Sequence, residues 1–143
     1  MRSAFYTKKP LKNLKYCIQR IRRGYCDADL WDIDSWFISV IVPMLRQFNK
    51  TRTGWPVPIQ EEYILENAKK HGMDHDEFFC NHCEEIDEAS NKKWSEILNT
   101  LADDFELVEK MYFSRTPNER EKQEELKNKC FETFSKWFFY LWD

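Results

Sequence analysis

The stretch WSEILNTLADDFELV, residues 94–108, decides the fold class of this 143-residue chain. Its large apolar residues recur every three or four positions, which is the spacing of one face of an α-helix. Such a face has to be covered by other elements, so we expect this helix to pack in a helical bundle. The residues of the face are Trp94, Ile97, Leu98, Leu101, Phe105 and Val108.

Two helices are predicted nearer the start of the chain. The first spans residues 10–23, shows apolar residues at helical spacing, and ends at Gly24. The second spans residues 30–48, and the carboxylate of Asp29 can cap its first turn. Apolar residues lie around nearly its whole circumference, so we expect a central helix that is enclosed by the other helices or by a second subunit. A kink is expected at Pro43.

A helical insertion is predicted at residues 60–92, after a loop that contains two prolines and a glycine. A short helix ends at Gly72, and Asp74 caps another that reaches about residue 88. The long helix then restarts at Ser90 or Asn91.

The last helix is predicted to start at Thr116-Pro117-Asn118-Glu119, where a capping box coincides with a proline at the first helical position. No segment shows the two-residue alternation of a β-strand. The chain is therefore predicted to be all-α and to form one domain over residues 1–143. Its architecture is a bundle of four main helices, with the insertion between the second and the third.

The composition is that of a single globular domain with its own core. Hydrophobic residues make up 42% and charged residues 33% of the chain, and this length suffices to fold without disulfides or a cofactor. Neither a run of about 18 apolar residues nor a signal peptide is found, so we expect no membrane association. The five cysteines are odd in number, which favours reduced thiols in a cytoplasmic protein.

The charge is distributed unevenly along the chain. Residues 1–24 contain eight Lys or Arg and no Asp or Glu, whereas the remainder carries a net charge of −11. Either the basic segment packs on the acidic remainder, or it binds an anion or a phosphate. The overall pI near 5.7 argues against general DNA binding.

Arginines and aromatic residues gather in sequence around Gly24. Arginine binds phosphate through two parallel hydrogen bonds, and aromatic rings stack on bases, so the cluster predicts a site for a nucleotide-type anion. The alternative is that Trp31 and Trp36 are buried in the core and that Asp32 and Asp34 neutralise the arginines. The candidate ligand-binding residues are Arg20, Arg22, Arg23, Tyr25, Trp31, Trp36 and Trp55.

Histidines and cysteines gather in the predicted insertion. His71, His75, Cys80 and Cys83 could supply two nitrogens and two thiolates to a structural zinc ion. Their spacing is not that of a familiar zinc module, so an insertion without metal is the alternative.

An acidic run, Glu84-Glu85-Ile86-Asp87-Glu88, resembles the first acidic element of the all-helical nucleoside triphosphate pyrophosphohydrolases, whose carboxylates hold magnesium. The Glu-x-x-Asp element that should follow on the next helix is missing from the sequence. The run is therefore interpreted as a solvated acidic face, and no catalytic residue is assigned.

Four motifs resemble a family of small, uncharacterised, all-helical bacteriophage proteins. They are Arg22-Arg23-Gly24-Tyr25 with Asp29-Leu30-Trp31-Asp32-Ile33-Asp34, Gly54-Trp55-Pro56, Trp94-Ser95-Glu96-Ile97-Leu98 with Phe105, and the terminal Leu141-Trp142-Asp143. The resemblance implies a phage accessory protein that works in the host cytoplasm. It implies no catalytic residues.

These observations favour a non-enzymatic phage protein that sequesters or inhibits a host factor. The preferred target is a nucleotide-type immune signal, held by the arginine and aromatic cluster, in a protein that forms a homo-oligomer. A protein-surface inhibitor that docks an acidic and aromatic surface on a host defence enzyme is one alternative. A magnesium-dependent nucleotide pyrophosphohydrolase-like enzyme is the other.

Overall fold

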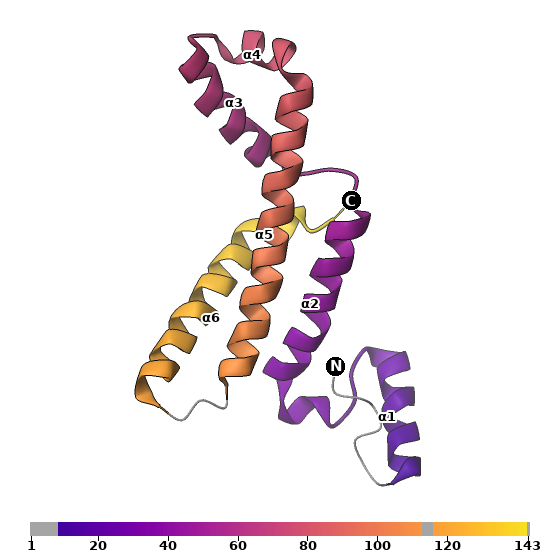
Figure 1. Cartoon of the computed structure of the whole chain (residues 1–143). Helices are drawn as coiled ribbons and strands as arrows, with labels where there is room; N and C mark the ends of the chain where they lie inside the picture. Colours follow the sequence, from indigo (N-terminus) through magenta and orange to yellow (C-terminus); the bar gives the residue numbers. More distant parts are fainter. Residues whose placement is uncertain (1–8, 113–115, 143) are drawn as a thin grey trace.

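The computed structural model describes residues 9–112 and 116–142, and the regular structure in these ranges is entirely helical (Figure 1). The all-α prediction is confirmed. Residues 1–8 of the basic segment and Asp143 of the terminal motif lie outside the described residues. The elements are α1 (Pro10–Arg23), η1 (Asp29–Trp31), α2 (Ile33–Thr51), α3 (Val57–His71), α4 (His75–Asn81), α5 (Cys83–Met111), α6 (Pro117–Trp137) and η2 (Phe138–Tyr140), where η denotes a 3-10 turn.

The long helix α5 organises the molecule. Figure 1 shows α2 and α6 on either side of its C-terminal part, and α3 and α4 at its N-terminal end. The apolar face predicted at residues 94–108 is buried as expected, apart from the half-buried Ile97. It forms the main core with residues of α2 and α6, among them Ile38, Val42, Leu45, Cys130 and Trp137.

The other described helices do not enclose the second helix, so the first of the two expected arrangements is wrong. α2 packs along α5, but Ile33 and Met44 are each 60% exposed. Apolar residues all around a helix do not reveal which side of it packs against other helices. Here one side of α2 packs on α5, and the opposite side faces a cleft and solvent. Pro43 lies inside the helix without ending it.

The predicted insertion forms a finger, by which we mean α3, α4 and residues 83–90 of α5. Gly72 ends α3 in the left-handed conformation, with φ of 66°, as the glycine signal predicts. Asp74 caps α4 by accepting a 2.8 Å hydrogen bond from the Glu77 backbone N–H. A second, smaller core of Ile64, Ala68, Phe78 and Ile86 holds the finger together.

The predicted restart at Ser90 or Asn91 is wrong, because α5 begins at Cys83 and continues through both residues. The break falls instead at His82, whose backbone leaves the helical region with φ of −129°. Serine and asparagine favour helix starts, but Ser90 is fully buried, and packing overrides that preference. The finger and the third main helix therefore share one continuous helix.

The start predicted for the last helix is confirmed, with Pro117 at its first position. The Thr116 hydroxyl lies 2.5 Å from the Glu119 carboxylate and donates to it, instead of accepting from the backbone. Near the end of the chain, Phe139 is 81% and Trp142 74% exposed. No helix in the described ranges is both long and apolar enough to cross a membrane.

Helix α1 has the predicted bounds but not the expected packing. Within the described residues it packs on no other helix. Its apolar residues form a stripe that faces solvent, with exposed fractions from 43% to 84%. We call this surface the α1 stripe, and its residues are Leu11, Leu14, Ile18 and Ile21.

Candidate ligand-binding site

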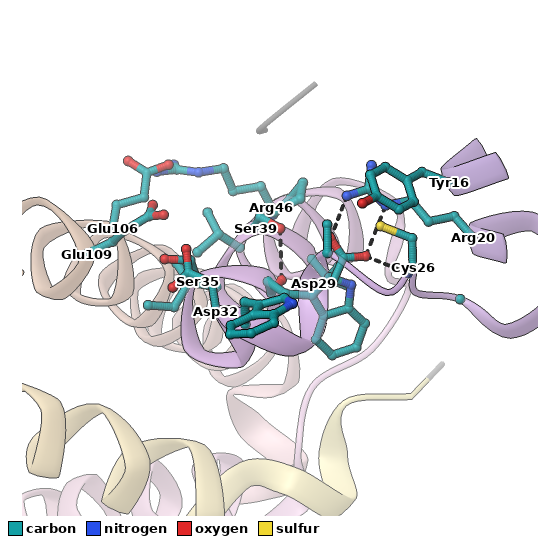
Figure 2. Close-up of a pocket in the computed structure, with 18 of the residues that line it drawn as sticks. Tyr16, Arg20, Cys26, Asp29, Asp32, Ser35, Ser39, Arg46, Glu106 and Glu109 are labelled. Atoms are coloured by element: carbon teal, nitrogen blue, oxygen red, sulfur yellow. Dashed lines mark hydrogen bonds and ion pairs between the residues drawn. The ribbon is translucent and has the colours of Figure 1, made fainter. Parts of the chain in front are cut away.

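A cleft of about 880 Å³ opens between α1 and α2 (Figure 2). Its walls come from α1, the following turn, α2 and two glutamates of α5. Volumes of about 300–1,000 Å³ are typical of small-molecule sites. The charged and aromatic side chains that line it are Lys12, Tyr16, Arg20, Asp29, Trp31, Asp32, Trp36, Arg46, Glu106 and Glu109.

The cleft exists because the chain turns sharply after α1. Gly24 adopts φ of 80°, a conformation that costs glycine little, and its N–H donates to the Arg20 carbonyl at 2.9 Å. The turn is anchored by Cys26, which is fully buried and whose N–H donates to the Asp29 carboxylate at 2.7 Å. The chain then enters η1 and α2, which leaves space between the two helices.

Asp29 links the turn back to α1. Its carboxylate accepts from Arg20 Nε at 3.1 Å and from Arg20 Nη2 at 2.5 Å. The hydrogen bond from Arg20 is the main reason that the pKa of Asp29 falls from 3.8 to about 2. The same pair raises the pKa of Arg20. Asp29 therefore does not cap the second helix, and Asp32 takes that position without a side-chain cap.

Asp27 gathers a second polar cluster at the end of α1. Its carboxylate accepts from Gln19 at 2.7 Å and pairs with Lys15 at 2.9 Å and with Arg23. The hydrogen bonds from Gln19, Lys15 and Arg23 hold the pKa of Asp27 well below its usual range. The basic helix thus pairs with carboxylates of the turn that follows it, rather than lying on the acidic helices of the bundle.

Three of the seven predicted binding residues line the cleft, namely Arg20, Trp31 and Trp36. Trp31 is not core packing, since its side chain is 91% exposed, and Trp36 is half-buried. The guanidinium groups of Arg20 and Arg23 are held by Asp29 and Asp27, and not by Asp32 and Asp34.

The other four predicted residues lie outside the cleft lining. Arg23 stacks over the Tyr25 ring at 4.7 Å, and Arg22 is exposed on α1. Trp55 packs against the main core in the loop after α2, at the end of that helix remote from α1. The sequence cluster is thus divided among the cleft, the turn and the core.

The sequence analysis missed Lys12, Tyr16 and Arg46. Lys12 lies 5.5 Å from the centre of the Tyr16 ring, and both line the cleft beside Arg20. The signal was available, because residues 12, 16 and 20 are four apart and share one helix face. That face lies opposite the α1 stripe around the helix.

The lining charges of the cleft nearly cancel. Figure 2 shows Arg20 with Asp29 at one end and Arg46 with Glu106 at the other. Arg46 also pairs with Asp103 at 2.8 Å, while its distance to Glu106 is 3.2 Å. Three cations and four carboxylates line the whole cleft. This balance disfavours a polyanion and suits a ligand with an aromatic ring and at most one or two negative charges.

The predicted zinc ligands do not converge. Both ring nitrogens of His75 are engaged, with Glu61 at 3.0 Å and Asp76 at 2.9 Å. The His71 ring lies 5.7 Å from the Phe78 ring, and the Cys83 thiol donates to the Phe79 carbonyl at 3.0 Å. No group of three or more His, Cys, Asp or Glu in the described ranges could hold a metal, so the residues do not fit zinc.

The acidic run at residues 84–88 forms no magnesium site in the described part of the chain. Its four carboxylates are exposed around the buried Ile86. Glu85 accepts a 2.7 Å hydrogen bond from the Tyr63 hydroxyl, which raises the pKa of Tyr63. The run therefore serves as the solvated face of a helix that packs through Ile86.

Comparison with known proteins adds no relative. No protein-family model, curated protein or solved structure matches the chain.

Proposed function

We propose that this protein is a non-enzymatic binding protein that holds a small nucleotide-type ligand in the cleft between α1 and α2. The observation that carries the proposal is the gathering of Lys12, Tyr16, Arg20, Trp31 and Trp36 around one space of about 880 Å³. Indole and phenol rings stack on bases, and a cation beside them can pair with a phosphate. The same side chains, if they were spread over the surface without a shared cleft, would not support a ligand site.

Lys12 is the cation best suited to a ligand phosphate. Arg20 already gives two hydrogen bonds to Asp29, and Arg46 is shared between Asp103 and Glu106. Lys12 rests over the Tyr16 ring, a weak contact that a phosphate could replace. This arrangement favours a mononucleotide or a cyclic nucleotide over a triphosphate.

The resemblance to phage accessory proteins suggests the biological context in which this protein would act. A phage protein of this kind would work in the host cytoplasm and would remove a nucleotide-type immune signal by sequestration. A homo-oligomer would be compatible with this role, because α1, which lines the cleft, lies at one end of the molecule.

Calorimetry against linear mononucleotides, cyclic nucleotides and inorganic phosphate tests the proposal. We expect one cyclic or mono-nucleotide to bind, and Trp31→Ala or Lys12→Ala to weaken binding at least tenfold. The matched controls are Trp142→Ala, which removes another mostly exposed indole that lies outside the cleft lining, and Lys122→Ala on α6. All four positions are exposed, so the variants should fold. Failure of every nucleotide to bind, or equal losses in the controls, would contradict the proposal.

The second candidate is a protein-surface inhibitor, and the α1 stripe favours it. Four aliphatic side chains at helical spacing are exposed, with Lys15 and Arg22 flanking them. Such a helix fits an apolar groove with an acidic rim on a partner protein. Ile18→Glu should abolish inhibition of that host enzyme, whereas Lys122→Glu should not, and neither should alter nucleotide binding in the cleft.

A further inference from the structure

The junction between α4 and α5 carries a pair of thiols that the proposed function does not use. Cys80 lies in the last turn of α4, and Cys83 is the first residue of α5. His82, immediately before Cys83, breaks the helix. Both cysteines are exposed, so small molecules can reach either sulfur.

The sulfur of Cys83 lies against the last turn of α4. It is 3.0 Å from the Phe79 carbonyl oxygen and 3.8 Å from that of Cys80 itself. The break at His82 therefore does not carry Cys83 away from α4, and its sulfur stays beside the turn that holds Cys80. Rotation of the thiols about their Cα–Cβ bonds is enough to change which group each sulfur faces. A disulfide needs two Cα atoms within about 7 Å of each other, and residues three apart in a turn meet this requirement.

The other three cysteines differ in accessibility. Cys26 and Cys130 are buried, and Cys17 is half-buried in α1. Burial raises the pKa of the Cys130 thiol to about 11, which disfavours its reactive thiolate at neutral pH. The exposed pair is therefore chemically distinct from the rest of the thiols in this protein.

We propose that Cys80 and Cys83 form a redox modification site, which a small disulfide such as oxidised glutathione closes into an intramolecular bond. The thiolate of one cysteine attacks the glutathione disulfide, forms a mixed disulfide and releases one reduced glutathione. The second cysteine, as its thiolate, then attacks the sulfur of the first and releases the second glutathione. The protein loses two protons and two electrons in all, and the oxidised glutathione gains them as two molecules of reduced glutathione.

Closure ties the end of α4 to the start of α5 across His82. The two helices meet at this residue, and Phe78 and Ile86 on either side of it belong to the finger core. The bond would restrict the angle between the helices without crossing the main core. The finger would then resist local opening more strongly when oxidised than when reduced.

Mass spectrometry of the full-length, reduced protein after treatment with oxidised glutathione tests the site. Trypsin releases residues 71–92 as one peptide, which contains Cys80 and Cys83 and no other cysteine. We expect this peptide to lose about 2 Da, while Cys26 and Cys130 stay free. In Cys80→Ser and in Cys83→Ser, the reaction should stop at a stable mixed disulfide between the remaining cysteine and glutathione. Cys17→Ser should form the internal disulfide as the wild type does.

Two glutathione adducts on the wild-type peptide, or no reaction under conditions that oxidise a small dithiol, would overturn the proposal. Disulfide-linked dimers in place of the internal bond would do the same. The readout does not depend on any ligand of the cleft, so the site and the proposed function can fail separately.

Discussion

Arg20 and Asp29 join α1 to the turn that follows it through two hydrogen bonds, at 3.1 and 2.5 Å. Because α1 packs on no other helix in the described part of the chain, its position depends on this pair and on the cluster at Asp27. One wall of the cleft is therefore held by polar contacts rather than by a hydrophobic core.

Replacing Asp29 with alanine should release α1 without unfolding the bundle. The variant removes the acceptor of both Arg20 and the Cys26 N–H. We expect trypsin to cleave several-fold faster at Arg20, Arg22 and Arg23, because proteases act on locally opened segments. The bundle should unfold at a urea midpoint close to that of the wild type. Asp34→Ala, at an exposed position of α2, is the control and should leave both values unchanged.

Acid should weaken the attachment of α1 in a defined range. The pKa of Asp29 is lowered from 3.8 to about 2 by Arg20, so its stabilising contribution is complete above pH about 4 and is lost as the pH falls through about 2. That contribution is at most about 2 kcal/mol. Amide exchange of α1, corrected for intrinsic rates, should rise across this range. In Asp29→Asn the rise should be smaller, because only the lowered pKa of Asp27 then contributes to it, and a profile equal to that of the wild type would contradict the assignment.

Replacing Ser90 with alanine should stabilise the protein. The Ser90 hydroxyl is fully buried and has no hydrogen-bond partner among the described residues. A buried polar group without a partner costs roughly 1–3 kcal/mol, so its removal should raise the free energy of unfolding by about 1 kcal/mol. Urea denaturation measures this change. Ser95→Ala is the matched control on the same helix and should lower stability, since Ser95 accepts from Asn49 at 3.0 Å.

The finger should loosen as the pH rises. The pKa of His75 is raised by hydrogen bonds with Asp76 and Glu61, and the second of these joins α4 to α3. The contribution of the protonated ring is present below pH about 6.5 and is lost as the pH rises through the raised value. Exchange of finger amides, corrected for intrinsic rates, should increase between pH 6 and 8. His75→Gln should show a flat profile.

The predicted homo-oligomer can be tested at the exposed aromatics near the end of the chain. Phe139 and Trp142 are mostly exposed, and large apolar side chains exposed near one another in the sequence are candidates for an interface. Light scattering after gel filtration should show a dimer or a larger assembly for the wild type. Phe139→Ala combined with Trp142→Ala should shift it to monomer. A monomeric wild type at high micromolar concentration would contradict the prediction.

Local signals in the sequence predicted the ends of several helices. Pro10 and Gly24 bound α1, Gly72 ends α3, and Pro117 starts α6, because proline and glycine restrict or permit backbone angles wherever they occur. The helical period of residues 94–108 likewise predicted a face that is buried. The helix ends and the helical period depend only on residues that are close in the sequence.

Features that depend on distant packing could not be predicted in the same way. No glycine or proline at His82 predicts the helix break there. The break lies between Phe78 and Ile86, which both pack in the finger core. The pairing of Arg20 with Asp29, instead of Asp32 or Asp34, depends on the path of the turn after Gly24. Trp31 and Trp55 look alike in the sequence, yet one lines the cleft and the other packs on the core.

The separation of α1 from the bundle also has an evolutionary consequence. Substitutions on the α1 stripe alter no residue of either core, so they leave the folding of the rest of the chain almost untouched. Natural selection can therefore vary this helix rapidly while the scaffold is inherited unchanged.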